Sequence, residues 1–484
     1  MSPDDRVVAV VGGGITGLSA AHRLLSAGPA GAGPGPIASP PRVIVVEADD
    51  RLGGKIRTEA IGGRPVEAGP DAFLSGSGEG ARGEALALCR ELGLSEQLIS
   101  PATGRASILL WGRLHPIPPG QVLGVPTSLA ALRALGRVGL ISPLGVARGS
   151  LDLVLPRRVG DDEAETAGEL VGHRLGTEVL SHVVNPLVGG IHAGNAGHLS
   201  AEAVTPQLLA AARSHRGLMR GLGAAPSGRP RQGFYSLAGG LSLLVDRLAD
   251  AIRNGGGELW TGAPVLALSR QDGRWRLELG SGREVIADAV VLAVPAFSAA
   301  ALLEPHDRSL SALLGTIDYA SVSLVTSTYP EESVAHPLDQ AGFLVSAARS
   351  RLRPTAPVPL LTACTFTTSK WPQTKRPGQV VLRASTGRSG DDRALQMTDD
   401  ELTAAVHAEL APLLGLSAPP TETVVHRWPR SFPQYRAGHL QTLARLEERA
   451  GRLPGLVLAG AAYRGLGIPA CLAQGQEAAG VVTA

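Results

Sequence analysis

The chain has 484 residues, of which 44% are hydrophobic and 18% are charged, and its formal net charge is +2. A sequence of this composition buries a large core and has room for about two or three domains, which excludes a disordered protein. The small net charge gives no indication of binding to nucleic acid.

The cysteines and the apolar runs limit the class of protein further. Cys89, Cys364 and Cys471 are widely spaced and form no CxxC pair, so we expect buried thiols, no disulfide framework and no bound metal. Glycine interrupts the N-terminal apolar run, which favours a strand over a signal peptide. The longest apolar stretch, residues 290–303, falls short of the roughly 20 residues that span a bilayer. We therefore expect a cytoplasmic protein.

Residues 7–25 have the pattern of a strand, a glycine turn and a helix. The strand Val7–Val11 leads into the segment Gly12, Gly13, Gly14, Ile15, Thr16 and Gly17, which has the spacing GxGxxG. The absent side chains permit a tight turn, close approach of a pyrophosphate and close packing of the helix on the strand. The anion is then expected at the positive N-terminus of the helix. This segment predicts a dinucleotide site.

A second strand, residues 43–46, ends at Glu47 and Ala48, where an acidic side chain can bind the ribose of an adenosine. Glu47 follows Gly17 by 30 positions, whereas the fingerprint expects roughly 20. Residues 28–41, GPAGAGPGPIASPP, resist regular structure and have little to bury, so we predict a surface insertion there. Without the insertion the spacing is the expected one.

The middle of the chain differs in character from both ends. Residues 116–156 are apolar with arginines spaced among leucines and valines, which predicts short amphipathic helices broken by Pro126 and Pro143. Their apolar faces are expected to form a core or a substrate pocket. The alternative is that they rest on a membrane surface with the arginines at the headgroups. Farther on, residues 274–279 and 289–295 are predicted strands.

Further glycine-rich segments indicate which dinucleotide is bound. Residues 51–58, RLGGKIRT, and residues 67–71, EAGPD, resemble the second glycine motif of the flavin-dependent amine oxidase and desaturase superfamily, in which this loop runs beside the flavin. Residues 456–460 read as a buried strand, and residues 465–469 introduce a helix that in this superfamily covers the flavin. The resemblance implies an α/β fold with a discontinuous Rossmann-like FAD-binding domain of the amine oxidase and glutathione reductase type.

Longer motifs narrow the resemblance to one family. The segments EAGPDAF (67–73), LTACTFTTSKWP (361–372), PQYRAGHL (433–440) and GAAYRGLGIPAC (460–471) together resemble the bacterial protoporphyrinogen and coproporphyrinogen oxidases, over nearly the whole chain. The implied domains are an FAD-binding domain, a mixed-sheet substrate domain and a helical subdomain. Their expected limits are 1–80, 231–300 and 425–484 for the first, 81–114, 211–230 and 301–424 for the second, and 115–210 for the third.

The resemblance implies non-covalent FAD as the cofactor, contacted by residues from all the glycine segments. These are Gly12, Gly13, Gly14, Ile15, Thr16, Gly17, Glu47, Ala48, Gly54, Lys55, Gly69, Pro70, Asp71, Val265, Trp428, Gly460, Gly467 and Ile468. Ala461 departs from the family pattern, in which a polar or acidic residue usually follows the last glycine of the flavin domain. Backbone N–H groups or water must replace that contact, and we expect a lower flavin affinity.

The implied reaction removes six electrons from a porphyrinogen in three passages through FAD, and oxygen leaves as hydrogen peroxide. The flavin accepts hydride and the pyrrole N–H groups can release protons to solvent, so no dedicated protein base is required. The sequence has no Ser/His/Asp or paired-carboxylate signature. The histidines are each expected to be structural, namely His115, His173, His192 and His439.

Substrate choice is expected to depend on carboxylates, because coproporphyrinogen carries four propionates and protoporphyrinogen carries two. Arg57 matches a family position near the active site and can grip a carboxylate with two hydrogen bonds. Weaker candidates are Arg105, Lys55 and the group Arg349, Arg351 and Arg353. We expect coproporphyrinogen as the substrate, with protoporphyrinogen as the alternative.

Two alternatives of other kinds stay open on the same fold. One is a flavin desaturase or amine oxidase, although an aromatic content of 3% disfavours an aromatic cage for an amine. The other is a non-catalytic flavin-binding partner of another haem-pathway enzyme. The expected partners are the porphyrinogen, molecular oxygen and, transiently, a ferrochelatase. A peripheral contact with the inner face of the membrane is the alternative to a purely cytoplasmic protein, and the oligomeric state is left open.

Overall fold

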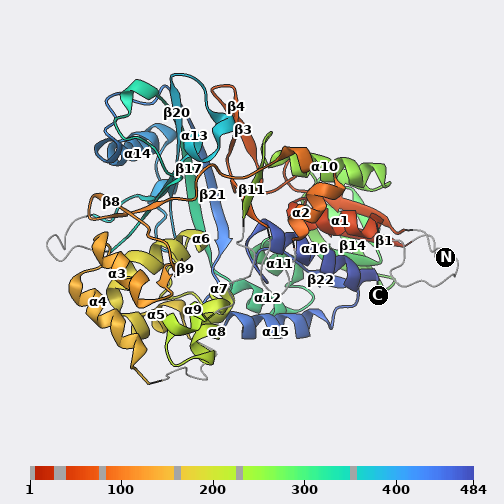
Figure 1. Ribbon diagram of the computed structural model, residues 1–484. Helices are drawn as coiled ribbons and strands as arrows, with labels where there is room; N and C mark the ends of the chain where they lie inside the picture. Colours follow the sequence, from red (N-terminus) through yellow and green to blue (C-terminus); the bar gives the residue numbers. More distant parts are fainter. Residues whose placement is uncertain are drawn as a thin grey trace.

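The structure is a computed structural model that describes residues 6–26, 40–75, 83–156, 165–224, 233–348 and 357–483. Figure 1 shows three parts: a layered α/β part that contains both ends of the chain, a large sheet, and a group of helices beside that sheet. Residues 28–39 of the predicted insertion lie outside the described residues. The arginine group 349–353 also lies outside them.

The α/β part is built on a five-stranded parallel sheet in the order β12-β2-β1-β16-β22. These strands are β12 (Glu258–Trp260), β2 (Arg42–Val46), β1 (Val7–Val11), β16 (Ala289–Leu292) and β22 (Leu456–Leu458). The central strands are buried on both faces, which explains their continuous runs of valine and isoleucine. The sheet joins segments far apart in sequence, and the strands predicted at its centre are confirmed.

Helices cover one face of this sheet. They are α1 (Ile15–Ser26), α2 (Glu84–Glu91), α10 (Ser242–Asn254) and α16 (Ile468–Thr483). Helices α1 and α16 pack unusually closely, because a Cβ atom at Gly475 would lie 2.3 Å from the carbonyl oxygen of Thr16. The N-terminal glycine turn and the C-terminal helix are therefore direct neighbours.

The opposite face carries an antiparallel sheet and three helices around a second apolar cluster that includes the fully buried Trp275. These elements are β13 (Val265–Gln271), β14 (Arg274–Leu279), β15 (Glu284–Ala287), α11 (Ala296–Leu303), α12 (Arg308–Gly315) and α15 (His439–Ala450). The apolar stretch 290–303 is divided between β16 and α11. No helix within the described ranges combines the length and apolar character needed to cross a membrane.

The large sheet has seven strands in the order β21-β17-β20-β19-β18-β7-β8, and every pairing is antiparallel except that of β18 with β7. The strands are β21 (Glu422–Pro433), β17 (Tyr319–Pro330), β20 (Gln379–Thr386), β19 (Leu361–Phe366), β18 (Gly342–Val345), β7 (Ser107–Leu110) and β8 (Arg113–Pro116). Helices α13 (Thr367–Lys370) and α14 (Asp399–Leu414) belong to the same part. The predicted mixed sheet is confirmed.

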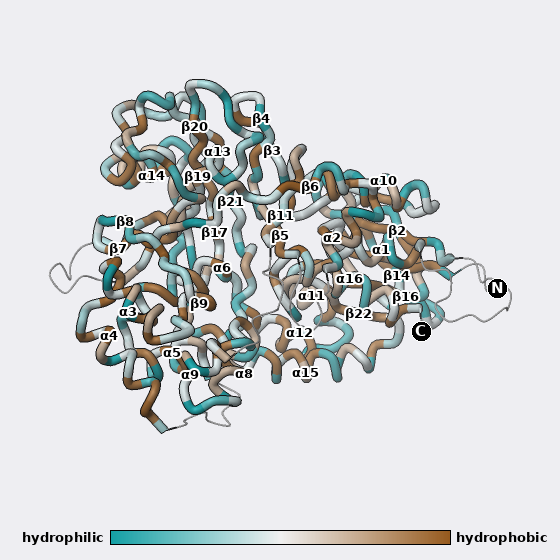
Figure 2. Tube along the Cα trace, in the orientation of Figure 1, coloured by the Kyte–Doolittle hydropathy of each residue, from teal (hydrophilic) through white to brown (hydrophobic). Residues whose placement is uncertain are grey.

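The helical part has its own core, and Figure 2 shows hydrophobic residues along its helices as well as in the strands. It contains α3 (Leu129–Arg137), α4 (Pro143–Ser150), α5 (Ala167–Leu175), the π-helical segment η4 (Val179–Gly189), α6 (Gly190–His192), α7 (Ala201–Val204), α8 (Pro206–Ser214) and α9 (Leu218–Gly223). This core includes residues of α8 and α9. The exact domain limits that we expect stay a prediction.

One expectation for this part is wrong. Helices were predicted before Pro126, but the chain forms a short hairpin of β9 (Gln121–Val122) and β10 (Val125–Pro126) there. Its two turn residues, Leu123 and Gly124, have φ angles of 50° and 82°. Positive φ at both positions is the geometry of a two-residue hairpin turn, and glycine adopts it without strain.

The remaining short elements connect these parts. The strands are β3 (Thr58–Ile61), β4 (Arg64–Glu67), β5 (Phe73–Leu74), β6 (Leu98–Ile99) and β11 (Phe234–Leu237), and single turns of 3-10 helix lie at Ser95–Gln97, Leu151–Leu153, Glu331–Ser333, Pro372–Thr374 and Arg393–Leu395.

Candidate functional site

The first glycine turn has the shape that a dinucleotide requires. Gly12 has a φ of 105°, and a Cβ atom there would lie 2.7 Å from the carbonyl oxygen of Ala293. A Cβ atom at Gly17 would lie 1.9 Å from the Gly12 carbonyl oxygen, whereas one at Gly14 would meet nothing within 4 Å. The outer two glycines thus permit the turn and the packing of the helix, and the middle one faces open space from which a pyrophosphate can approach.

Glu47 lies directly beside this turn. Its carboxylate accepts hydrogen bonds from the backbone nitrogens of Gly13 at 2.6 Å and Asp49 at 2.9 Å. The exposed Ala48 follows it. Val265 is half-buried at the start of β13, near Ala263, whose N–H donates to the Glu47 carbonyl oxygen at 2.8 Å. The structure therefore brings these predicted adenosine-side positions to one edge of the parallel sheet.

The second glycine segment touches the first. The backbone nitrogen of Gly53 donates to the Gly13 carbonyl oxygen at 2.8 Å, and a Cβ atom at Gly54 would lie 3.3 Å from the Gly14 Cα. The Arg51 guanidinium donates to carbonyl oxygens within the same segment and holds its shape. Side chains larger than glycine at these positions would close the space between the two segments.

The third segment lies against the second. A Cβ atom at Gly69 would lie 1.9 Å from the carbonyl oxygen of Lys55. The indole Nε1 of Trp428 donates to the Ala68 carbonyl oxygen at 2.6 Å, and Arg383 donates to that of Gly69. The Lys55 side chain is accessible to solvent, yet protein surrounds it closely enough that desolvation lowers the pKa of its ammonium.

Asp71, next to Pro70, has strong partners within the protein. Its carboxylate lies 2.7 Å from Nζ of Lys370 and 3.4 Å from Nε1 of Trp371. Burial alone would raise the pKa of Asp71, but Lys370 and Arg383 outweigh that effect and lower the pKa to about 2. The carboxylate is thus ionised and ties the third glycine segment to the large sheet, and a contact with the cofactor stays a prediction.

The C-terminal glycine loop has a backbone shape that two glycines and two side chains fix. Gly460 and Gly465 have φ angles of 130° and 128°, which only glycine adopts readily. The Gln474 side chain accepts from the Gly460 nitrogen at 3.4 Å, and the Tyr435 hydroxyl accepts from the Gly465 nitrogen at 2.8 Å. Gly467 then precedes Ile468, the first residue of α16. The loop therefore leads directly into α16, the helix that packs against α1.

Tyr435 and Gln474 are supporting residues that we did not single out from the sequence. Tyr435 lies in the PQYRAGHL segment, which served only as a family signature. Its ring stacks on His439 at 4.1 Å between centroids, and Nε2 of His439 lies 2.9 Å from the Tyr463 carbonyl oxygen. This contact is consistent with the structural role expected for His439, which stays a prediction. The same holds for His115, whose Nδ1 lies 2.7 Å from the Val138 carbonyl oxygen.

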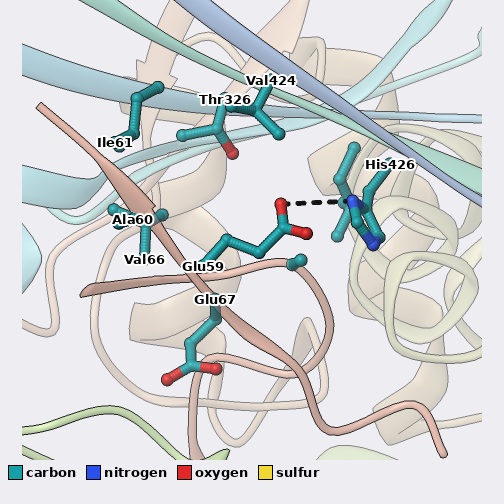
Figure 3. A pocket seen from close by; sticks show the side chains of 10 residues that line it. Glu59, Ala60, Ile61, Val66, Glu67, Thr326, Val424 and His426 are labelled. Atoms are coloured by element: carbon teal, nitrogen blue, oxygen red, sulfur yellow. Dashed lines mark ion pairs between the residues drawn. The ribbon is translucent and has the colours of Figure 1, made fainter. Parts of the chain in front are cut away.

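Arg57 lies at the end of the second glycine segment, in a small charged cluster. Its guanidinium lies 2.7 Å from the Glu59 carboxylate, whose second oxygen lies 3.3 Å from Nδ1 of His426 on β21. Figure 3 shows Glu59 pointing toward His426 across a pocket that Glu67 also lines. Burial lowers the pKa of His426. The carboxylate of Glu59 raises this pKa, whereas the positive charge of Arg57 lowers it further. The Arg57 side chain is 40% exposed, so it keeps N–H groups available to a ligand.

Arg105 does not join this cluster. Its guanidinium lies 3.1 Å from the Asp339 carboxylate and 2.6 Å from the Asp339 carbonyl oxygen, and its side chain is 70% exposed. These bonds hold Arg105 next to the starts of β7 and β18, which pair with each other. The structure therefore gives Arg105 weaker support than Arg57 as a substrate contact.

The three cysteines are free and buried, as predicted. Within the described ranges, no group of three or more histidines, cysteines or carboxylates is placed to hold a metal ion.

Residues 15–483 match the family described as "Flavin containing amine oxidoreductase". The chain is 33% identical to coproporphyrinogen III oxidase of Bacillus subtilis, covering 99% of this chain and 98% of the relative. It is 32% identical to protoporphyrinogen oxidase of Bos taurus, covering 98% of each. A crystal structure of an Exiguobacterium protein assigned to the protoporphyrinogen oxidases superposes with a TM-score of 0.82 at 32% identity, covering 99% of this chain and 98% of that one.

Proposed function

Because the chain belongs to the flavin containing amine oxidoreductase family, we propose that it is an FAD-dependent oxidase that converts coproporphyrinogen III to coproporphyrin III in haem biosynthesis. The balanced reaction removes six hydrogens from the porphyrinogen and reduces three O₂ to three H₂O₂. The substrate assignment rests on the similarity to coproporphyrinogen III oxidase along 99% of the chain. The cofactor assignment rests on the turn Gly12–Gly17 and the other glycine segments packed against it, which together we call the cradle.

We assign the residues of the glycine segments to the two halves of FAD. We assign the adenosine half to the turn Gly12–Gly17 with Glu47, Ala48 and Val265, and the flavin half to the other segments. The residues assigned to the flavin half are Gly54, Lys55, Gly69, Pro70, Asp71, Trp428, Gly460, Gly467 and Ile468. Bound FAD supplies the hydride acceptor and passes the electrons to oxygen. The protein's task is then to bind and orient both molecules.

Arg57 is the residue that we assign to a substrate propionate. Its position beside Gly54 and Lys55 brings a guanidinium to a segment that we assign to the flavin half, and its planar N–H groups match a carboxylate. The carboxylate of Glu59 already holds one edge of this guanidinium at 2.7 Å and so fixes its orientation. Arg105, an exposed residue just before β7, is a secondary candidate.

Oxidation of protoporphyrinogen IX is the second candidate function, favoured by the likeness to the bovine enzyme. One assay distinguishes the two. Purified, FAD-loaded protein is incubated in air with each porphyrinogen while porphyrin fluorescence and hydrogen peroxide are measured. We expect faster turnover of coproporphyrinogen III, with three peroxides for each porphyrin. Faster turnover of protoporphyrinogen supports the second candidate, and no turnover of either contradicts the proposal.

We propose that the protein acts in the cytoplasm and that its helical part can meet a membrane surface. Leu144 in the first turn of α4 is 80% exposed, and Leu151 and Val154 just after this helix are 46% and 63% exposed. The half-buried Arg148 lies between them in sequence and donates to the His173 carbonyl oxygen at 2.8 Å. Apolar side chains beside an arginine suit the headgroup region of a bilayer. Flotation with anionic vesicles tests this contact. A transient contact with a ferrochelatase is proposed on the family resemblance alone.

A further inference from the structure

His192 has an imidazole with one nitrogen buried and the other accessible. Nδ1 is inaccessible and has no hydrogen-bond partner among the described residues, whereas Nε2 is not among the buried unpaired atoms. The ring as a whole is half-buried. Surrounding protein lowers the pKa of His192 to about 4, so the imidazole is neutral near pH 7. The sequence predicts a structural role for His192, but the described residues supply no hydrogen-bond partner for its Nδ1.

The position of His192 connects it to the C-terminal glycine loop through Tyr435. Its ring centroid lies 6.4 Å from that of Tyr435, whose hydroxyl binds the backbone of Ala461 and Gly465. Leu466 of the same loop packs against the core of the helical part. Figure 1 shows α6 where the helical part meets the large sheet. Tyr435 is therefore a neighbour of both His192 and the C-terminal glycine loop.

The backbone around His192 is fixed in an uncommon shape. His192 is the last residue of α6, which directly follows the π-helical segment η4, and π-helical turns occur frequently at functional sites. Ala193 follows with a φ of 47°, a left-handed conformation that is rare for a residue other than glycine. Gln434 donates to the His192 carbonyl oxygen at 2.9 Å, and Ser389 donates to that of Ala193 at 2.7 Å. Contacts from the large sheet thus set the direction of the side chain.

The burial of Nδ1 decides which hydrogen bond His192 can offer. An N–H group buried without a partner is rarer in proteins than an unpaired acceptor. The favoured tautomer therefore carries its proton on Nε2, the accessible nitrogen. His192 then presents a neutral N–H donor from Nε2.

We propose that His192 is a substrate-binding residue that donates a hydrogen bond from Nε2 to a propionate carboxylate of the porphyrinogen. A tetrapyrrole offers peripheral carboxylates as hydrogen-bond acceptors, which match the Nε2–H donor of His192. The inner pyrrole N–H groups are donors and do not match Nε2–H. This inference rests on the proposed function and adds a second carboxylate contact, on the helical part, to the one assigned to Arg57.

The test compares two ligands that differ only in their carboxylates. FAD-loaded wild type and His192→Phe are titrated with coproporphyrin III and with its tetramethyl ester, and binding is followed by the porphyrin absorption band. His192→Phe keeps a ring against Tyr435 but removes the donor. We expect its affinity for coproporphyrin to fall about tenfold to one hundredfold, while its affinity for the ester stays within about twofold of wild type. In turnover, KM for the porphyrinogen should rise with little change in kcat.

The exposed His198 provides a matched control, because His198→Phe makes the same exchange in the following loop. It should bind both ligands as wild type does. Equal weakening of coproporphyrin and ester by His192→Phe, or no weakening of either, overturns the inference. His192→Asn, which retains an N–H donor, should recover part of the lost affinity. If wild type oxidises neither porphyrinogen, the proposed function fails instead, and the two failures are thereby distinguished.

Discussion

The hydroxyl of Tyr435 donates a hydrogen bond to the carbonyl oxygen of Ala461 at 2.6 Å. The same hydroxyl accepts from the backbone nitrogen of Gly465 at 2.8 Å, so one side chain joins both ends of the C-terminal glycine loop. Ala461 is the position at which the family resemblance implies a polar side chain. Tyr435, which precedes the loop in sequence, therefore fixes the shape of the loop backbone.

Replacing Tyr435 by phenylalanine should lower FAD affinity. The exchange leaves the Gly465 N–H and the Ala461 carbonyl without their partner, at a cost of about 1 to 2 kcal/mol, or roughly fivefold to thirtyfold in the dissociation constant. Flavin fluorescence titration of the apoprotein measures the change. Tyr463→Phe is the matched control, because the Tyr463 hydroxyl is buried and has no hydrogen-bond partner in the described part of the chain, so its removal should not weaken binding. Equal effects of the two exchanges would contradict the loop-shaping role.

Replacing Glu47 by alanine should weaken FAD binding by roughly tenfold or more, since charge-assisted hydrogen bonds to the ribose contribute about 1.5 to 3 kcal/mol. The exchange also removes the acceptor of the Gly13 N–H. Thermal stability should recover as FAD is added in excess, because the cofactor binds the folded state. Asp50→Ala, at an exposed position of the same turn, should bind FAD as wild type does. Unchanged affinity in Glu47→Ala would exclude it from the site.

Local patterns predicted the parallel sheet and the first glycine turn well. The strand Val7–Val11 and the helix after it follow from a buried run and a glycine spacing whose physical requirements are local. The same reasoning failed before Pro126, because the hairpin there depends on a turn at Leu123–Gly124 that the apolar composition conceals. Composition predicts burial, but not whether a buried segment is a strand or a helix.

The long-range partners of the site could not be predicted from spacing. Asp71 is separated from Lys370 by 299 positions, and Arg57 shares a carboxylate with a histidine on β21. Such pairs form only when the large sheet is placed against the glycine segments. Nothing in the sequence distinguishes His192 from the other histidines. Its Nδ1, which has no hydrogen-bond partner among the described residues, can be recognised only in the folded chain.

Arg57→Ala should raise KM for coproporphyrinogen and lower kcat, because it removes a propionate contact and misplaces the reacting carbon, while FAD content stays near normal. Arg57→Lys should restore the charge but not the paired hydrogen bonds, so it should recover only part of the loss. Steady-state kinetics with both porphyrinogens at low and high salt measure these effects. The wild-type preference for coproporphyrinogen should shrink as salt screens the exposed contacts.

Arg105→Ala is the comparison for this series, because its guanidinium is more exposed and is bound to Asp339. We expect a smaller effect on KM than in Arg57→Ala. If Arg57→Ala has wild-type kinetics, Arg57 is a surface residue held by Glu59 and has no part in substrate binding.

Stability should depend on pH through Glu67, which accepts hydrogen bonds from the Leu241 nitrogen at 2.7 Å and the Thr58 hydroxyl at 3.0 Å. Burial raises the pKa of Glu67 from 4.5 to about 7, although these hydrogen bonds oppose the shift. Between these pH values the folded protein keeps a proton that the unfolded chain has lost. The free energy of unfolding must therefore decrease as pH rises through this window.

Glu67→Gln should lack this decrease. Denaturant unfolding of the FAD-saturated protein at pH 5 and pH 8 measures it, as the difference between wild type and variant at each pH. We expect wild type to lose, relative to the variant, on the order of 2 kcal/mol between the two values. Glu96→Gln, at an exposed position, should follow the wild-type profile. If Glu67→Gln follows that profile as well, Glu67 is ionised throughout this range, and its hydrogen bonds to α10 and β3 outweigh its burial.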